Sequence, residues 1–472
     1  MPEPIPCLIR TLAPVHLGAD EVYEPLSFVI DDQKSCLVAF EPGDFMNLLP
    51  EPDRRRFLEI CRRGTVDSIL DIYRFYPQHR SQARGRAVAV CPGLVEHYRE
   101  VIQARGDARR LKTTLNQFTI HRTAFLAQDQ RPYIPGSAVK GALRTAYLNA
   151  RARIIKTDTP TKTTKSGKVV FDPATLEKRL LEYDQIPKDP FRLLKVSDFL
   201  PVGEVQTRIV YAVNEKKKIS KFQARGPYQI LEVIEPGAAF LGTIAVVDLP
   251  PELRRLAKIT HFFTLEELFQ AAQTFYRHEK EQEEAHLFDL GLTAAPLPAG
   301  NGRTPLRLGR HSGAECVTIA GHRHIKIMQA RGEESKELPH ATTLWLAADF
   351  HQREHRQKAN LRPMGWAALR ELTPEARQEL ADREAAFRQR VEESRLAGEK
   401  GHRQGPGTDP RGVAGAAADE AQGRHRPGDR GACGPGLPSG ADRSRLGRRP
   451  FSGNLRSSSL ESGPVVGSAS FP

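Results

Sequence analysis

The sequence predicts an α+β protein in which short strands alternate with amphipathic helices. Short runs rich in Val, Ile, Leu and Phe, such as residues 7–13 and 206–213, are bounded by turn residues, as strands usually are. Other runs, such as residues 53–63 and 265–286, repeat apolar residues at the spacing of one helix face. A chain of 472 residues is long enough for about two or three domains with sizeable cores.

Residues 1–155 are predicted to form an N-terminal domain with a helical insertion. Turn residues such as Asp31 and Pro42 separate its first strands. The expected elements are a strand over residues 7–13, a hairpin over 27–30 and 36–40, helices over 53–63 and 67–76, and a long strand pair over 111–127.

A further helix is expected to start within residues 131–144, which combine a turn with a helix start. Pro135 and Gly136 interrupt an extended run, and Ser137 is a favourable N-cap. The apolar residues that follow recur on one helix face, which should therefore be buried. These residues are Val139, Leu143, Ala146, Ala150 and Ile154.

Two cations lie near the start of this helix. Lys140 and Arg144 are one turn apart on the same side, where unpaired backbone N–H groups and the helix dipole favour an anion. The segment is therefore interpreted as a phosphate-binding helix start, with an RNA backbone as the anion. A purely structural loop-to-helix junction is the alternative, because Pro-Gly-Ser before a helix is common.

Residues 170–400 are predicted to form a second α+β domain, which follows a polar, basic and mobile loop over residues 156–169. Thr264 and Thr373 are suitable N-caps for its two long helices. The expected elements are strands over residues 193–199, 206–213, 228–234 and 240–247, and helices over 265–286 and 374–396.

Residues 215–225 form a basic segment between two of these strands, predicted as a hairpin or loop. A solvated charged surface is the ordinary interpretation of such a run. Contact of Lys217 and Lys218 with phosphate is the second interpretation.

Residues 401–472 differ from the rest of the chain. They are rich in Gly and Pro, have lost apolar periodicity, and contain Arg but no Lys. Such a composition does not bury a core, so this segment is predicted to be a low-complexity, disordered tail.

The overall composition favours a polyanionic partner and a reducing compartment. The formal net charge is +13, and the Lys and Arg residues are spread along the chain. Six cysteines lie far apart without a C-x-x-C pair, so neither a zinc site nor a disulfide framework is predicted. No run approaches the ~18 apolar residues that a membrane helix needs. A cytoplasmic protein without a cofactor is therefore expected.

Four segments carry a resemblance to a known family. Residues 133–144 (YIPGSAVKGALR) resemble the signature of the RAMP proteins of CRISPR effector complexes. Residues 12–18 (LAPVHLG), 306–313 (LRLGRHSG) and 361–369 (LRPMGWAAL) resemble further motifs of one branch, the fifth subunits of the Csm (type III-A) complex. The four segments follow the order found in that family.

The resemblance implies a fold, a role and partners. The fold would consist of two ferredoxin-like, or RRM-like, RAMP domains with helical insertions. The role would be that of a non-catalytic subunit that binds the guide RNA backbone near its 3' end, caps the assembly and supports guide maturation. The partners would be the guide RNA, the other Csm subunits, especially the repeated backbone subunit, and host ribonucleases.

The same resemblance assigns residues to RNA binding. Gly136, Ser137, Lys140, Gly141 and Arg144 would contact the guide backbone, and His16 and Gly18 would shape the neighbouring turn. Gly309, Arg310, Ser312 and Gly313 would form a second loop, in which glycine permits close backbone approach.

Other functions remain open at this point. Some RAMP ribonucleases use a histidine in the first glycine turn as a general base, so an endoribonuclease that uses His16 is one alternative. A mainly structural subunit is another. His351 and His355 match the H-x-x-E-H zinc pattern, but the neighbouring cations disfavour a metal. His322 and His324 are expected to form a surface pair on a strand.

Overall fold

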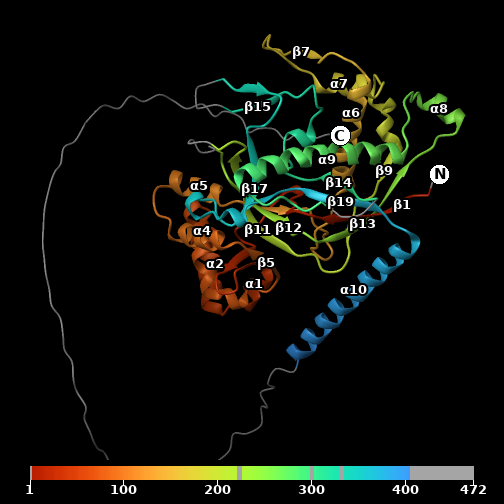
Figure 1. Cartoon of the computed structure of the whole chain (residues 1–472). Coiled ribbons are helices and arrows are strands. Elements are labelled where there is room, and N and C mark those ends of the chain that lie inside the picture. The colour runs from red at the N-terminus through yellow and green to blue at the C-terminus, as the bar shows by residue number, and fades with distance from the viewer. Residues whose placement is uncertain (1–2, 220–225, 298–301, 329–333, 404–472) are drawn as a thin grey trace, which may run out of the picture. The chain divides into compact units, whose positions relative to one another are not determined.

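The computed structural model describes residues 3–219, 226–297, 302–328 and 334–403, and most of its strands belong to two large sheets (Figure 1). The predicted α+β class is confirmed, because helices and strands are mixed along the chain. The predicted tail lies outside the described residues from residue 404 onward.

The first sheet has six antiparallel strands in the order β10-β13-β1-β19-β14, and β9 also pairs with β13. These strands are β1 (Ile5–Thr11), β9 (Leu194–Val196), β10 (Leu200–Pro201), β13 (Ala239–Val246), β14 (Thr304–Arg307) and β19 (Trp366–Glu371). Because β1 lies between β13 and β19, the start of the chain is held by segments far along the sequence.

The second sheet has nine strands, in the order β2-β6-β12-β11-β5-β4-β3, with β17 paired to β11 and β18 paired to β17. They are β2 (Gly18–Val22), β3 (Phe28–Asp31), β4 (Cys36–Ala39), β5 (Arg86–Val90), β6 (Ile120–Thr123), β11 (Thr207–Lys216), β12 (Gln229–Ile234), β17 (Thr343–Ala348) and β18 (Arg362–Pro363). The predicted hairpin is confirmed as β3 and β4. Strands from before residue 155 and after residue 170 share both sheets.

The helices surround these sheets (Figure 1). They are α1 (Pro42–Leu48), α2 (Glu51–Arg63), α3 (Val66–Phe75), α4 (Pro92–Gln103), α5 (Ala108–Gln117), α6 (Gly136–Ile154), α7 (Pro173–Leu180), α8 (Pro251–Ala257), α9 (Leu265–Leu290) and α10 (Pro374–Arg403). The helices predicted over residues 53–63 and 67–76 are confirmed as α2 and α3.

The strand pair predicted over residues 111–127 is wrong, since α5 occupies its first part and only β6 is a strand. The Asp107 carboxylate caps α5 by accepting a hydrogen bond of 2.8 Å from the Arg110 N–H. Leu111, Leu115 and Phe118 then pack into one hydrophobic cluster, so helical spacing prevails over their strand propensity.

Three other boundaries differ from the prediction. The loop predicted over residues 156–169 contains β7 (Thr161–Thr163), which pairs with β8 (Val169–Phe171) in a short hairpin. The strand predicted over residues 193–199 is reduced to β9, because a 3₁₀ turn over Pro190–Leu193 precedes it. The last helix continues past residue 396 to Arg403.

The long helix α9 is defined by its caps. As predicted, Thr264 is the N-cap: its hydroxyl accepts from the Glu267 N–H at 3.1 Å, while the Glu267 carboxylate accepts from the Thr264 N–H at 2.7 Å. This reciprocal pair satisfies donors that a helix start leaves unpaired. The helix ends at Gly291, whose positive φ of 67° suits glycine.

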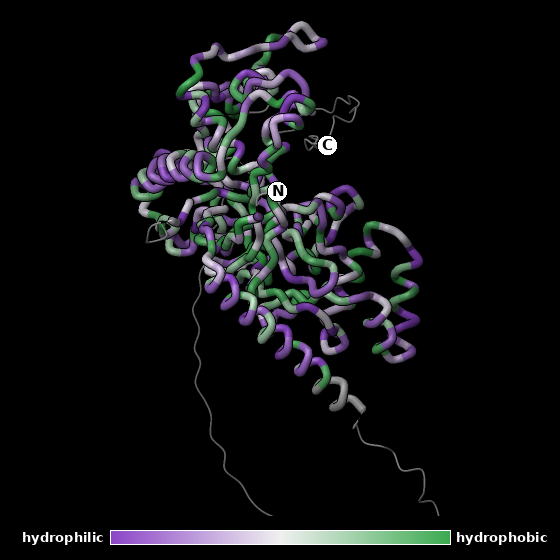
Figure 2. Tube along the Cα trace, turned by 90° about the vertical axis from the view of Figure 1, so that its right-hand side faces the viewer, coloured by the Kyte–Doolittle hydropathy of each residue, from purple (hydrophilic) through white to green (hydrophobic). Residues whose placement is uncertain are grey.

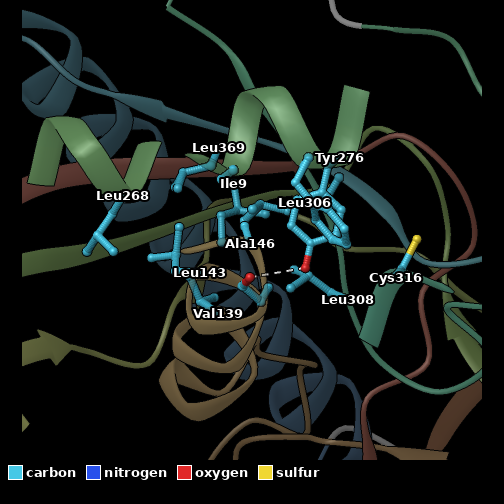
Figure 3. Close-up of a cluster of buried hydrophobic side chains, with 14 of the residues drawn as sticks. Ile9, Val139, Leu143, Ala146, Leu268, Tyr276, Leu306, Leu308, Cys316 and Leu369 are labelled. Carbon is cyan, nitrogen blue, oxygen red and sulfur yellow. Dashed lines mark hydrogen bonds between the residues drawn. The ribbon is translucent and has the colours of Figure 1, made fainter. Parts of the chain in front are cut away.

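The largest core lies where α6 and α9 pack with the first sheet (Figure 3). Leu143 and Ala146 of α6 meet Leu268 and Tyr276 of α9 in this cluster, and the Tyr276 hydroxyl donates to the Ala142 carbonyl at 3.1 Å. Full burial of a side chain such as Leu143 or Leu268 stabilises the fold by roughly 1.5–3 kcal/mol. The predicted apolar face of α6 ends early, because Ile154 is 72% exposed.

A buried polar network crosses this core. The Arg307 guanidinium of β14 pairs with the Glu283 carboxylate of α9 at 2.6 Å, and the Trp366 indole N–H of β19 donates to the same carboxylate at 2.6 Å. Arg307 also lies over the Trp366 ring, 4.8 Å from its centroid. The network therefore ties two strands of the first sheet to α9.

The final helix contacts the rest of the chain through its first half. Leu380 packs with the cluster of Leu8 and Val202, and Glu384 pairs with Arg131 at 2.7 Å. Figure 2 shows largely hydrophobic strands in the middle of the protein and mostly hydrophilic residues along α10. The side chains of residues 388–396 are all exposed.

Replacing Glu283 with Ala should lower the free energy of unfolding by about 3–5 kcal/mol, because Arg307 would remain buried without its counter-charge. Urea denaturation measures this loss. Glu281→Ala, an exposed position on the same helix, is the matched control and should change stability by less than about 0.5 kcal/mol. Equal unfolding free energies for the two variants would contradict the role given to Glu283.

Candidate nucleic-acid interface

The glycine-rich loop after β14 lies directly on the turn that follows β1. The Arg310 N–H donates to the His16 carbonyl at 2.8 Å. Gly309 has a φ of 79°, and a Cβ atom there would lie only 2.2 Å from the His16 carbonyl oxygen. Glycine is therefore required at position 309 by the close approach of these two backbones.

Residues 361–369, the closing motif, contact both the glycine-rich loop and the turn after β1. The Gly365 N–H donates to the Pro14 carbonyl, and the Leu308 N–H donates to the Gly365 carbonyl, both at 2.8 Å. Gly365 has a φ of 89°, and a Cβ atom there would approach the Leu308 carbonyl oxygen to 2.7 Å. Three motifs that are far apart in the sequence thus form one backbone-to-backbone cluster.

His16 lies beneath this cluster rather than on the surface. It is 1% exposed, and its Nδ1 is 2.7 Å from the Glu232 carbonyl oxygen, so Nδ1–H donates there. Its Nε2 has no hydrogen-bond partner among the described residues. Burial, together with the nearby Arg310, lowers the pKa of His16 to about 4, so the ring is neutral at physiological pH.

Two other histidines border the loop. His311 stacks on Trp345 with centroids 3.9 Å apart, its Nε2 is 2.7 Å from the Gln229 side-chain oxygen, and burial lowers its pKa to about 3. Burial and Arg310 also lower the pKa of His121, on β6. These imidazoles, with their lowered pKa values, lie beside the exposed cation Arg310.

His121 and Trp345 were not among the predicted site residues. The sequence around His121 was assigned to a long strand pair, which gave no reason to single it out. Trp345 is in a strand that carries no family motif. Only the three-dimensional pairing of β6 with β2, and the stacking on His311, place them near the loop.

The far side of the loop lines a cavity of about 510 Å³. Ser312 is buried there, and Gly313 has a φ of 80°. Lys217 also lines it, but its ammonium pairs with the Glu315 carboxylate at 2.6 Å. Lys218, the next residue, is exposed. Of the predicted pair, Lys218 is the more accessible to a phosphate.

The N-terminus of α6 is in contact with another segment of the chain, residues 196–198. The Gly136 N–H donates to the Asp198 carboxylate at 2.8 Å, and a Cβ atom on Gly136 would lie 2.5 Å from the Val196 carbonyl oxygen. The Ser137 N-cap prediction is wrong: Pro135 is the N-cap residue, and no side-chain cap hydrogen bond forms within the described structure. Asp198, distant in sequence, supplies the acceptor instead.

The two signature cations are also engaged within the chain. The Lys140 ammonium donates to the Leu194 carbonyl at 2.9 Å. The Arg144 guanidinium pairs with Glu177 at 2.8 Å and with Asp189 at 2.9 Å. Gly141, by contrast, is exposed, with open space where a Cβ atom would stand.

The predicted residues therefore separate into two groups. The first surrounds the glycine-rich loop: His16, Gly18, Lys217, Lys218, Gly309, Arg310, Ser312 and Gly313. The second lies along α6: Gly136, Ser137, Lys140, Gly141 and Arg144. The groups are linked by backbone, since the Ala124 N–H donates to the Leu17 carbonyl and the Tyr133 N–H donates to the Ala124 carbonyl.

The zinc-like pattern does not have the required geometry. His351 precedes a 3₁₀ turn over Arg353–His355, so the two histidines are not one turn apart on an α-helix. His351 packs against Tyr228, with centroids 4.4 Å apart, and His355 is exposed. The described part of the chain contains no group of three or more His, Cys, Asp or Glu residues able to hold a metal.

The two histidines of the second candidate pair, His322 and His324, contact different partners. His322 and His324 precede β15 (Ile325–Ile327), so the strand predicted for them is wrong. His322 contacts the Thr159 hydroxyl at 2.8 Å, while His324 pairs with Glu337 at 2.9 Å and stacks on Phe171.

Among the described helices, none has the length and apolar character to cross a membrane.

Comparison with known proteins gives a family and several relatives. Residues 8–286 match the RAMP superfamily. The chain is 27% identical over 218 residues to the "CRISPR system Cms protein Csm5" of Methanocaldococcus jannaschii, an alignment that covers 44% of this chain and 46% of that protein. The chain thus spans about half the length of the curated relative it matches.

Two solved structures are also similar. One is a chain of the cryo-EM structure of a Csm-crRNA-target RNA ternary complex in a type III-A CRISPR-Cas system, with 18% identity, a TM-score of 0.46, and coverage of 78% of this chain and 100% of that chain. The other is the crystal structure of T. onnurineus Csm5, with 17% identity, a TM-score of 0.41, and coverage of 76% and 99%.

Acid should destabilise this region through its buried histidines. In the folded chain the pKa of His16 is about 4, whereas an unfolded histidine has a pKa near 6.5, so the unfolded state takes up the proton first. This stability is present above pH ~6.5 and is lost as the pH falls towards 4. Urea denaturation at pH 7.5 and 5.0 measures the loss, of which His16 should contribute about 2 kcal/mol at pH 5.

The variant His16→Asn should retain a donor to the Glu232 carbonyl and lose this part of the pH dependence. The exposed His340→Asn is the matched control and should leave the pH dependence as in the parent protein. An unchanged pH dependence in His16→Asn would rule out the buried imidazole as its source.

Proposed function

Because the chain belongs to the RAMP superfamily, we propose that it is a non-catalytic RNA-binding subunit of a type III-A CRISPR (Csm) effector complex. In this proposal it binds the guide RNA backbone near the 3' end, caps the assembly and supports guide maturation. Its partners are the guide RNA, the other Csm subunits, especially the repeated backbone subunit, and host ribonucleases that trim the guide.

One observation carries the proposal: the glycine-rich loop is held at a fixed position and presents an exposed cation. Gly309 and Gly365 allow the loop, the first turn and the closing motif to touch through their backbones. Arg310 is exposed at the top of this cluster. A loop held by backbone hydrogen bonds that presents an exposed guanidinium suits a phosphate chain, which has the same chemistry whatever the base sequence.

The residues of α6 have a divided role in this proposal. Ser137 and Gly141 are exposed and would be open to the guide backbone. Lys140 and Arg144 already have partners in the chain, so they would orient α6, and Gly136 would permit its close contact with the segment around Ser197. Arg310 and Lys218 would then supply the phosphate contacts nearest to the loop.

The endoribonuclease alternative requires His16 to act as a general base. A general base must come within hydrogen-bond reach of the hydroxyl that it deprotonates. His16 is 1% exposed, with its Nδ1 engaged by the Glu232 carbonyl, so binding is favoured over cleavage. Incubation of the purified protein with guide precursor in EDTA tests this choice, since cleavage that disappears in His16→Asn would favour the nuclease.

Replacing Arg310 with Ala should weaken binding of single-stranded RNA and make it less dependent on salt. If Arg310 neutralises one phosphate, the slope of log K against log salt should fall by about 0.7. Fluorescence anisotropy at several salt concentrations measures both quantities. Arg62→Ala, which removes an exposed cation from α2, is the matched control; the same slope in both variants would remove Arg310 from the interface.

The function itself is tested by the RNA that the protein carries. The full tagged chain, purified from its native host, should bring spacer-derived RNAs that share a repeat-derived tag, with 3' ends confined to a narrow range. Sequencing of the bound RNA ends measures this. Random RNA, or assembly with other Csm subunits that survives ribonuclease treatment without guide, would contradict the capping role and favour a mainly structural subunit.

A further inference from the structure

A basic cleft lies between α7 and α8, and it shares no residue with the glycine-rich loop or with the predicted contacts on α6. Its volume is about 750 Å³. Six cations line this cleft: Lys178, Arg179, Lys188, Arg254, Arg255 and Lys258. Only two carboxylates, those of Glu182 and Asp184, line it with them.

Both carboxylates of the basic cleft already have ion-pair partners. Glu182 pairs with Arg151 and lies 3.8 Å from His261, neither of which is a cleft cation. Asp184 pairs with Lys188 at 2.8 Å. Outside the cleft, Asp248 pairs with Arg254 at 2.6 Å.

The remaining cations have no counter-charge. Within the described part of the chain, no ion pair is formed by Lys178, Arg179, Arg255 or Lys258. Arg179 makes only a long hydrogen bond of 3.5 Å to the Thr157 hydroxyl. The cleft therefore has a surplus of four positive charges, which a bound anion would neutralise. The partial negative charge of each helix C-terminus, roughly half a unit, offsets only part of this surplus.

The helix α8 is held in place by polar and ring contacts rather than by burial of its side chains. None of its described residues is buried, and Leu253 and Leu256 are 48% and 76% exposed. Figure 1 shows α8 standing apart from the two sheets. It is held by Arg254, whose guanidinium donates to the Leu249 carbonyl at 2.7 Å and lies over the Phe262 ring at 4.7 Å. Its C-cap, Lys258, has a φ of 53°.

The position of α7 depends on the signature helix. Arg144 of α6 pairs with Glu177, the residue before Lys178, and with Asp189, the residue after Lys188. Arg144 thus fixes two of the three segments that carry cations of the cleft. The Arg144 guanidinium, which the sequence suggested as a phosphate ligand, therefore also supports residues next to cations of the cleft.

We propose that the basic cleft binds a phosphate-bearing strand, namely a single-stranded segment of RNA. The cations are spread over two helices and the turn that carries Lys188, which suits several successive phosphates better than a single one. The inference extends the RNA-binding role to a second surface, and it rests on residues that the proposed function does not use.

The test compares two triple variants of the full chain that remove the same charge. The cleft variant is Arg179→Gln, Arg255→Gln and Lys258→Asn; all three residues are exposed, and Asn tolerates the left-handed conformation at position 258. The matched control is Arg62→Gln, Lys112→Gln and Arg377→Gln, three exposed cations on α2, α5 and α10. The probe is a fluorescein-labelled oligouridylate, titrated at several salt concentrations.

The cleft variant should bind the oligouridylate at least tenfold more weakly at low salt, and the slope of log K against log salt should fall by about 2, from ~0.7 for each phosphate contact. The control variant should keep the slope of the parent protein. Equal slopes for the two triple variants would overturn the proposal. Displacement of the oligouridylate by ATP or inorganic phosphate at comparable phosphate concentration would also overturn it, in favour of a small-anion site.

Arg310→Ala, measured in the same assay, separates this inference from the proposed function. A loss of slope in the cleft variant but not in Arg310→Ala would support the cleft and reject the loop. The opposite result would reject the cleft and leave the loop as the RNA-binding surface.

Discussion

The ion pair between Arg307 and Glu283 is the interaction on which the arrangement of the first sheet depends. A charge inside a protein is costly unless a counter-charge and hydrogen bonds satisfy it, so these two groups admit one arrangement of α9 against β14. The Trp366 indole uses the second oxygen of the same carboxylate, which adds β19 to the constraint. Glu279 and Arg323 repeat the pattern at 2.5 Å, one turn earlier on α9.

The glycine-rich loop receives its position from this network. Arg307 is the last residue of β14, and the loop begins directly after it, while Gly365 precedes Trp366 in the closing motif. Arg307 and Trp366 are both held by the buried network, and next to them the loop backbone meets the first turn and Gly365 at hydrogen-bond distance. Glycines at positions 309 and 365 are what this contact requires, because a Cβ atom at either would collide with a carbonyl oxygen. Side chains that face outward, such as Arg310, are free of this structural demand.

Much of the fold was predictable because its signals are local. Strand runs bounded by turns and the N-cap at Thr264 need only neighbouring residues. The errors have a physical cause in contacts between distant residues. Asp198 takes the capping role expected of Ser137, and Glu177 and Asp189 take up Arg144, although nothing near residues 136–144 indicates those carboxylates. Residues 108–117 show a different error. Packing of Leu111 and Leu115 against a hydrophobic cluster selects a helix there, whereas the sequence pattern favoured a strand.

The net charge of +13 says how far cations outnumber carboxylates, but it does not say which cations are available to a partner. In this chain the cations of the most recognisable motif already have partners within the protein: Lys140 donates to a carbonyl, and Arg144 bridges two carboxylates. Among the described residues, several cations without an ion pair lie elsewhere, on elements such as the end of α7 and α8. A motif and an electrostatic footprint can therefore occupy different surfaces of one protein. Lys140 and Arg144 of the motif then hold the geometry of the fold, and the exposed cations of the basic cleft are the ones available to attract a polyanion at long range.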